Sequence, residues 1–215
     1  IGFYNILECC RRHKVEHLVF ASSSSVYGGN RKVPYSEADK VDNPVSLYAA
    51  TKKSDELMAH CYSKLYGIPT TGLRFFTVYG PMGRPDMAYF SFSQKIMHGE
   101  TIRIFNNGDM MRDFTYVEDI VTGVMNMLNH PPKDNGKGAR YKIYNIGNNS
   151  PEKLMYFVET LEEALGRKAK KEFLPMQPGD VYQTYADVSE LMKDFGFKPE
   201  TSLKDGLTEF VKWFR

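Results

Sequence analysis

Tyr48 and Lys52 stand four positions apart in a stretch, residues 46–66, that contains no glycine or proline. Residues at positions i and i+4 share one face of an α-helix, so the sequence predicts a helix over Ser46–Tyr66 that carries a phenol beside an ammonium. A free tyrosine has a pKa near ~10 and is a poor base at neutral pH. An ammonium ~4 Å away, at an effective dielectric constant of ~20, stabilises a phenolate by about 4 kcal/mol before desolvation. Such a phenolate can take a proton from a sugar or alcohol hydroxyl.

A run of four serines, Ser22 to Ser25, follows a short apolar segment that begins at His17. That segment is typical of a strand buried on both faces of a parallel sheet. Parallel α/β sheets bind ligands at the carboxyl ends of their strands, where a serine hydroxyl could bond a reacting oxygen and relay its proton. A Tyr-x-x-x-Lys pair alone more often packs on its helix, and a serine run can be a solvated turn. The occurrence of the Tyr-x-x-x-Lys pair together with a serine run at the end of a strand favours a catalytic role.

The elements around these residues predict an α/β protein with a parallel sheet. A strand over residues 17–22, the helix over 46–66 and a strand over 70–76 form a βαβ crossover. Residues 28–45 and 131–140 are rich in Gly, Pro, Asn and Asp, which is typical of loops. The remaining pattern predicts helices over 2–12, 89–97, 117–128 and 152–165, strands over 102–105, 114–116 and 141–146, and a tail from residue 168 with a short strand and two short helices.

Composition excludes several classes of protein. The chain has 215 residues, 42% of them hydrophobic and 25% charged, which argues against disorder and collagen-like repeats. A net charge of +2 is too small to predict a nucleic-acid partner. Three cysteines cannot pair completely, which favours a reducing compartment. With neither a signal-peptide pattern nor an apolar run of ~18 residues, we expect a cytoplasmic protein without a membrane partner in the part given.

Four blocks of sequence together resemble one family. The chain is similar, over its whole length, to the extended short-chain dehydrogenase/reductases that act on nucleotide sugars. Within them it is most similar to UDP-glucuronate 4-epimerases, through Pro81–Ala88 (PMGRPDMA) and Met176–Val181 (MQPGDV). The resemblance implies a Rossmann-type parallel-sheet domain that binds NAD and a smaller α/β domain that binds a UDP-sugar. The four blocks, in order, are Phe20–Gly28 (FASSSSVYG), Tyr48–Lys52 (YAATK), Leu73–Pro81 (LRFFTVYGP) and Arg112–Ile120 (RDFTYVEDI).

The resemblance also implies a role for individual residues. Tyr48, Lys52 and Ser23 would be catalytic, and Tyr48, Lys52 and Phe75 would contact NAD, with Phe75 beside the nicotinamide. No metal is expected. Plain alternatives stay open: Phe75 as a core aromatic, Arg84 as an ordinary loop arginine, and Arg112 as a surface pair with Asp113 or Asp119. The implied substrate-binding residues are Ser24, Ser25, Thr77, Arg84 for the hexuronate carboxylate, Arg112 for the pyrophosphate, and Gln177 and Asp180 for the uridine ribose.

Three positions separate the activities known in this family. Dehydratases carry an Asp-Glu pair where Ser24 and Ser25 stand, and the decarboxylating relatives carry Glu in place of Ser25. UDP-galactose epimerases usually have Asn in place of Thr77. We therefore expect NAD-dependent epimerisation at C4 of a UDP-hexuronate. The alternatives are a UDP-glucose/galactose 4-epimerase, a UDP-glucuronate decarboxylase, or a non-catalytic truncated relative that binds nucleotide sugars.

The family's glycine-rich dinucleotide turn does not occur in this sequence. We expect that about the first third of the protein precedes this stretch, and that the 215 residues alone bind NAD weakly, are inactive and are poorly stable. The expected NAD-binding domain covers 1–83, with 113–150 returning to it, and the nucleotide-sugar domain covers 84–112 and 151–215. The resemblance also implies a homodimer through the Ser46–Tyr66 helix.

Overall fold

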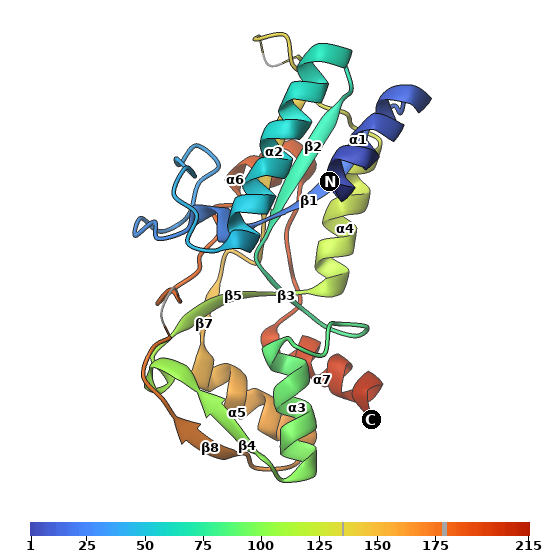
Figure 1. Ribbon diagram of the computed structural model, residues 1–215. Helices are drawn as coiled ribbons and strands as arrows, with labels where there is room; N and C mark the ends of the chain where they lie inside the picture. The colour runs from blue at the N-terminus through green and yellow to red at the C-terminus, as the bar shows by residue number, and fades with distance from the viewer. Residues whose placement is uncertain (135, 178–179) are drawn as a thin grey trace. The chain divides into compact units, whose positions relative to one another are not determined.

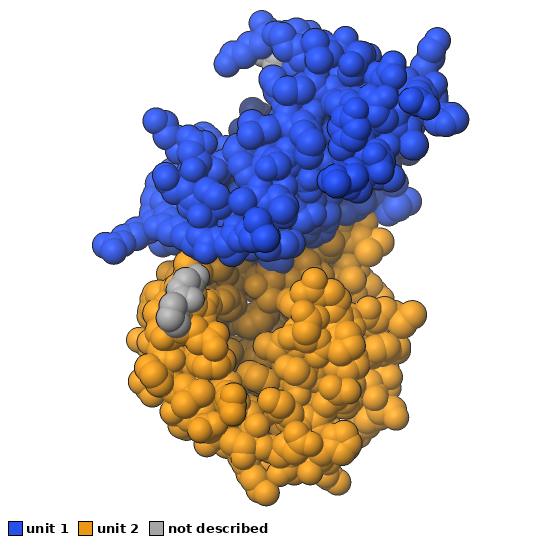
Figure 2. Space-filling model, in the orientation of Figure 1, with its two compact units in different colours: residues 1–76, 122–146, 186–197 blue, residues 77–121, 147–185, 198–215 orange. Residues whose placement is uncertain are grey.

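A computed structural model describes residues 1–134, 136–177 and 180–215 of the chain. The chain divides into two compact units, which are coloured separately in Figure 2. Unit 1 comprises Ile1–Phe76, Thr122–Ile146 and Ala186–Phe197, and unit 2 comprises Thr77–Val121, Gly147–Tyr185 and Lys198–Arg215. The boundaries of these units differ from those of the expected domains at four places. Residues 77–83, 113–121 and 147–150 lie in unit 2, and residues 186–197 lie in unit 1.

Unit 1 is built on a parallel sheet of three strands. The strands β1 (Leu18–Ser23), β2 (Thr70–Phe75) and β6 (Tyr141–Ile146) lie in the order β1-β2-β6, as the βαβ pattern predicts. Figure 1 labels β1 and β2 of this sheet. The central strand β2 is buried from Thr70 to Arg74. The expectation that β1 is buried on both faces was wrong, because Ala21 is exposed.

Helices cover both faces of this sheet. The helices α1 (Gly2–His13) and α2 (Leu47–Tyr66) pack on one face around Leu7, Phe20 and Ala59. The serine expected to begin α2 caps it, since the Ser46 hydroxyl accepts a hydrogen bond from the Ala49 N–H, and Gly67 ends it with φ of 69°. On the other face, α6 (Ser189–Phe195) is bound to β6 through ion pairs of Lys142 with Glu190 and Asp194.

The segment between β1 and α2 is anchored to unit 1, although it forms no long element. It begins with a 3-10 turn, η1 (Ser24–Tyr27), which interrupts the serine run after Ser23. The Tyr35 ring stacks on Tyr27 with 4.6 Å between centroids, and Tyr35 also bridges to Ala186. The segment therefore joins a second apolar cluster of unit 1, made of Val26, Tyr27, Tyr35, Val41, Phe76, Ala186 and Val188.

Unit 2 contains two small sheets. In the first, β5 (Met111–Tyr116) pairs in parallel with β3 (Thr77–Tyr79) and in antiparallel with β7 (Pro151–Lys153). In the second, β4 (Thr101–Ile104) pairs in parallel with β8 (Lys170–Phe173), and the turn η2 (Phe105–Gly108) follows β4. The strand β7 was not expected, because three residues show no alternation, and the helix expected from residue 152 begins at Leu154.

Three helices surround the core of unit 2: α3 (Ala88–His98), α5 (Leu154–Leu165) and α7 (Leu203–Phe214). Aromatic rings fill this core, and Phe114 and Phe157 stack with centroids 4.6 Å apart. The helix α4 (Val117–Leu128) begins in unit 2 and continues into unit 1. None of the helices that the described residues form is long and apolar enough to cross a membrane.

Candidate active site

The first turns of α2 carry Tyr48 and Lys52, the two residues that the sequence predicts to be an acid–base pair. Tyr48 is 53% exposed, so its phenol is accessible to a ligand. The Nζ atom of Lys52 lies 6.0 Å from the centre of the Tyr48 ring. The helix periodicity that the sequence predicts therefore does bring the two groups to one face.

Lys52 also connects this helix with the carboxyl end of β1. Its ammonium donates a hydrogen bond to the carbonyl oxygen of Ala21 at 3.1 Å, and it lies 3.6 Å from the Asp55 carboxylate. Ala21 stands two residues before Ser23, the last residue of β1. Unit 1 thus brings α2 and the end of β1 together through one ammonium, where parallel sheets place their ligands.

The serines occupy three different environments. Ser23 is buried, and its Oγ accepts a hydrogen bond from the Ser25 N–H at 3.2 Å, which caps η1. Ser24 is half-buried and Ser25 is exposed. Phe75, the expected nicotinamide contact, is half-buried at the end of β2 and pairs in register with Ser23. Ser23 and Phe75 are therefore neighbours at the carboxyl edge of the sheet.

The predicted pyrophosphate-binding arginine meets one of the two predicted ribose-binding residues in unit 2. Arg112, on β5, donates from Nη2 to the Asp180 carboxylate at 2.7 Å and from Nη1 to the Tyr182 carbonyl oxygen at 3.1 Å. The alternative partner Asp113 is fully buried and accepts hydrogen bonds from the N–H groups of Asn148 and Asn149. The side chain of Arg112 is thus paired with Asp180, which is itself a candidate site residue.

The other predicted substrate-binding residues of unit 2 are half-buried or exposed. Thr77 begins β3 and is half-buried. Arg84 is exposed and forms an ion pair with the equally exposed Asp86 at 3.1 Å. Gln177 is exposed, and its neighbours Pro178 and Gly179, which belong to the motif that favours the hexuronate enzymes, lie outside the described residues.

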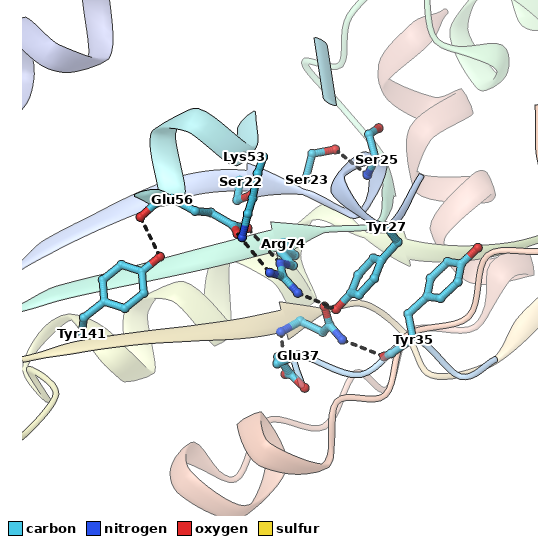
Figure 3. A network of polar contacts seen from close by, with 11 residues as sticks. Ser22, Ser23, Ser25, Tyr27, Tyr35, Glu37, Lys53, Glu56, Arg74 and Tyr141 are labelled. Carbon is cyan, nitrogen blue, oxygen red and sulfur yellow. Dashed lines mark hydrogen bonds and ion pairs between the residues drawn. The ribbon is translucent and has the colours of Figure 1, made fainter. Parts of the chain in front are cut away.

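A buried polar network beneath the end of β1 was missed by the sequence reasoning (Figure 3). Arg74, on β2, donates to both oxygens of Glu56, on α2, at 2.8 and 2.9 Å. Two signals could have indicated it: Arg74 is a charge inside an apolar strand, and Glu56 stands four positions after Lys52. Burial would raise the pKa of Glu56, but the hydrogen bonds and charge of Arg74 hold it below its usual value.

The side chains at the carboxyl edge of the unit 1 sheet suit a nucleotide cofactor. In the part of the chain that the structure describes, no group of three or more His, Cys, Asp or Glu side chains could hold a metal ion. At the sheet edge, an accessible phenol, an ammonium and the half-buried ring of Phe75 offer hydrogen-bonding and apolar contacts for a ribose and a flat ring. These residues fit the nicotinamide half of NAD.

Comparisons with known proteins agree on the family. Residues 1–147 match the NAD-dependent epimerase/dehydratase family. The chain is 54% identical to protein CapI of Staphylococcus aureus, over all of this chain and 67% of that protein. It is 49% identical to UDP-glucuronate 4-epimerase 1 of Arabidopsis thaliana, over 99% of this chain and 52% of that protein. The chain therefore spans about two thirds of the bacterial relative and about half of the plant one.

Comparison with solved structures indicates the same family. The fold is similar to the UDP-glucuronic acid 4-epimerase of Bacillus cereus, solved with UDP-glucuronic acid and NAD, with a TM-score of 0.88 and 34% identity over 99% of this chain and 65% of that one. It is also similar to the UDP-glucose 4-epimerase of Thermotoga maritima, with a TM-score of 0.88 and 28% identity over 99% of this chain and 68% of that one. The predicted α/β fold, family and NAD cofactor are confirmed, and the chain belongs to the NAD-dependent epimerase/dehydratase family.

Proposed function

We propose that the complete protein interconverts the C4 epimers of a UDP-hexuronate, UDP-glucuronate and UDP-galacturonate. The observation that carries this proposal is the position of Lys52, whose ammonium reaches both the face of α2 that holds Tyr48 and the backbone at the end of β1. This arrangement supports deprotonation of a carbohydrate hydroxyl at the edge of the sheet.

NAD, when bound, would supply the hydride acceptor and donor for C4 of the sugar. Tyr48, as phenolate, takes the proton of the 4-hydroxyl and later gives it back. Lys52 stabilises the phenolate by its charge and contacts the nicotinamide ribose. Ser23 hydrogen-bonds the reacting oxygen and relays its proton to Tyr48. Because the cofactor is regenerated in each cycle, the reaction has no net redox change.

The sugar must rotate between the two hydride transfers. We therefore propose that the protein binds the nucleotide more tightly than the hexose. Arg112 would bind the pyrophosphate, since its guanidinium presents a fork that suits phosphate oxygens. Arg112 lies 2.7 Å from the carboxylate of Asp180, the proposed ribose-binding residue, so the two side chains would contact neighbouring parts of one nucleotide. Strong binding of the nucleotide leaves the weakly held sugar free to rotate.

Specificity for a hexuronate is proposed to depend on small hydroxyls and one cation. Ser24 and Ser25 leave no acid–base pair for elimination, and Thr77 adds another hydroxyl. Arg84 is exposed and could exchange Asp86 for the substrate carboxylate, because an exposed ion pair contributes only about 0–1 kcal/mol. The relatives named as UDP-glucuronate 4-epimerases support the same substrate.

Product analysis tests this function. The complete protein with NAD is incubated with UDP-glucuronate, and the sugar nucleotides are separated by anion-exchange chromatography. We expect UDP-galacturonate, whereas UDP-xylose would indicate decarboxylation and no product would favour a non-catalytic relative. Tyr48→Phe keeps the ring but removes the acid–base oxygen, and it should lower the rate by about 100-fold to 10,000-fold. An unchanged rate would contradict the assignment of Tyr48.

A UDP-glucose/galactose 4-epimerase is the second candidate, and the similarity to the Thermotoga maritima enzyme favours it. The two candidates share the roles of Tyr48, Lys52 and Ser23 and differ in the sugar. Parallel assays with UDP-glucose and UDP-glucuronate separate them by the ratio of kcat/KM. A higher value for UDP-glucose would replace the hexuronate proposal.

We also propose that the protein forms a homodimer through α2. Leu57, Cys61 and Leu65 are exposed at positions i, i+4 and i+8 of this helix, so they form an apolar stripe. Ile6 on the neighbouring helix α1 is 53% exposed. Sedimentation equilibrium of the complete protein and of Leu57→Asp should show a dimer and a weakened dimer, respectively, and a wild-type monomer would exclude this assembly.

A further inference from the structure

Three buried polar side chains stand side by side across the sheet of unit 1, one position before its strands end. The register pairs Ser22 with Arg74 and Arg74 with Asn145, and their exposures are 2%, 3% and 0%. Side chains at paired positions of neighbouring strands point to the same face. A sheet interior is ordinarily apolar, so this row needs polar partners from the elements that cover it.

The first partner is Glu56 of α2. Its Oε1 accepts hydrogen bonds from the Ser22 hydroxyl at 2.7 Å and from Arg74 Nε at 2.8 Å, and its Oε2 accepts from Arg74 Nη2 at 2.9 Å. Tyr48, Lys52 and Glu56 are spaced i, i+4 and i+8, so they follow one stripe of the helix. The face that carries the proposed acid–base pair therefore continues into a carboxylate locked to two strands.

The second partner is Tyr27, the last residue of η1 (Figure 3). Its hydroxyl accepts from Arg74 Nη1 at 3.0 Å and donates to Asn145 Oδ1 at 2.7 Å. Burial raises the pKa of Tyr27 to about 12, so the phenol keeps this donating proton at neutral pH. The network thus reaches the turn that begins directly after Ser23.

We propose that Glu56, Arg74 and Tyr27 are positioning residues, which set α2 and η1 against the end of β1 so that Tyr48, Lys52 and Ser23 address the same substrate oxygen. A two-pronged arginine–carboxylate contact permits one relative geometry, whereas apolar side chains can slide past one another. A displacement of ~1 Å between catalytic groups can reduce a rate by about 100-fold. The inference rests on the proposed function only for the identity of the reacting groups.

Tyr27→Phe tests this inference, because it keeps the ring and removes the hydroxyl that joins Arg74 and Asn145. In the complete protein loaded with NAD, we expect kcat to fall by about tenfold or more, while KM for UDP-glucuronate and the bound NAD stay unchanged. Tyr35→Phe is the matched control. It removes a hydroxyl from the ring stacked on Tyr27, and that hydroxyl donates to the Asn30 carbonyl oxygen in the loop, so kcat should stay at the wild-type value.

A second readout does not depend on turnover. Hydrogen exchange of the Ser25 amide, which donates to Ser23 Oγ, should accelerate in Tyr27→Phe and not in Tyr35→Phe. If the wild-type protein turns out to lack epimerase activity, the proposed function fails, and this exchange measurement still decides whether the network holds the turn. Unchanged exchange together with unchanged kcat would overturn the inference.

Two checks distinguish a positioning role from a general loss of folded protein. Activity is normalised to the folded, NAD-loaded fraction, and a second variant is measured. A loss of activity that only follows the folded, NAD-loaded fraction would contradict a positioning role. If Tyr27→Phe does not fold, the double variant Glu56→Leu with Arg74→Met replaces the buried pair by apolar side chains, which often preserves folding. We expect this folded variant to show the same fall in kcat at constant KM, and wild-type kcat there would overturn the inference.

Discussion

The ammonium of Lys52 donates a hydrogen bond to the carbonyl oxygen of Ala21 at 3.1 Å. This contact joins the stripe of α2 that carries Tyr48 to the strand that ends at Ser23. The same nitrogen therefore has two effects, because it holds the helix against β1 and places a positive charge near the phenol. The proposed acid–base chemistry depends on both.

Removal of the Lys52 charge should reduce activity strongly. We expect Lys52→Met to lower kcat by about 100-fold or more, because the phenolate of Tyr48 loses its stabilising cation. The rate of epimerisation of UDP-glucuronate measures this effect. The matched control is Lys64→Met, which removes a charge at the opposite end of α2, where the ammonium donates to the Lys137 carbonyl oxygen. A rate for Lys52→Met within tenfold of that of Lys64→Met would contradict the role of Lys52.

Arg112 should affect substrate binding more than the chemical step. Arg112→Ala removes charge-assisted hydrogen bonds to the pyrophosphate, each worth about 1.5–3 kcal/mol, so we expect KM for the UDP-sugar to rise by about 10-fold to 100-fold. Steady-state kinetics give KM and kcat separately. Arg103→Ala is a suitable control, because Arg103 lies in the same unit and forms an exposed ion pair with Glu172 at 3.4 Å. Equal KM values for the two variants would exclude Arg112 from the binding site.

Stability should depend on pH through Glu37. Burial raises the pKa of this carboxyl above its usual value of 4.5, Asp187 adds to the increase, and the Asn145 N–H and Arg74 oppose it. A raised pKa in the folded state means that the contribution of Glu37 to stability is fully present below pH 4.5 and is lost as the pH rises through the folded-state pKa.

We therefore expect Glu37→Gln, which keeps an acceptor for the Asn145 N–H, to stabilise the protein at neutral pH. The difference in Tm between Glu37→Gln and wild type should be larger at about pH 8 than near the carboxyl's ordinary pKa. Thermal unfolding at a series of pH values measures this difference, and other titrating groups cancel in the comparison. A difference that decreases as the pH rises would have the wrong sign.

Gly206 should not tolerate a side chain, although it lies inside the helix α7. An added Cβ would clash with the Tyr79 hydroxyl and would lie 2.8 Å from its Cζ and 2.9 Å from Tyr116 Cδ2. Gly→Ala normally stabilises a helix by up to about 1 kcal/mol, but overpacking costs about 1–3 kcal/mol, so we expect Gly206→Ala to be destabilising. Urea unfolding tests this, with Gly2→Ala as the control, because nothing lies within 4 Å of that Cβ. Equal stabilities of the two variants would show that the core of unit 2 adapts.

The sequence by itself determined the elements and the face shared by the acid–base pair. Ser46 and Gly67 delimit α2, and the spacing of Tyr48 and Lys52 brings them together, because caps and helix periodicity act between residues close in the chain. Only the tertiary structure decided which distant polar groups meet. The burial of Arg74 and its pairing with Glu56, like the contact of Arg112 with Asp180 across 68 positions, depend on packing. A charge removed from water takes whichever partner the fold brings within reach, and no local pattern encodes that choice.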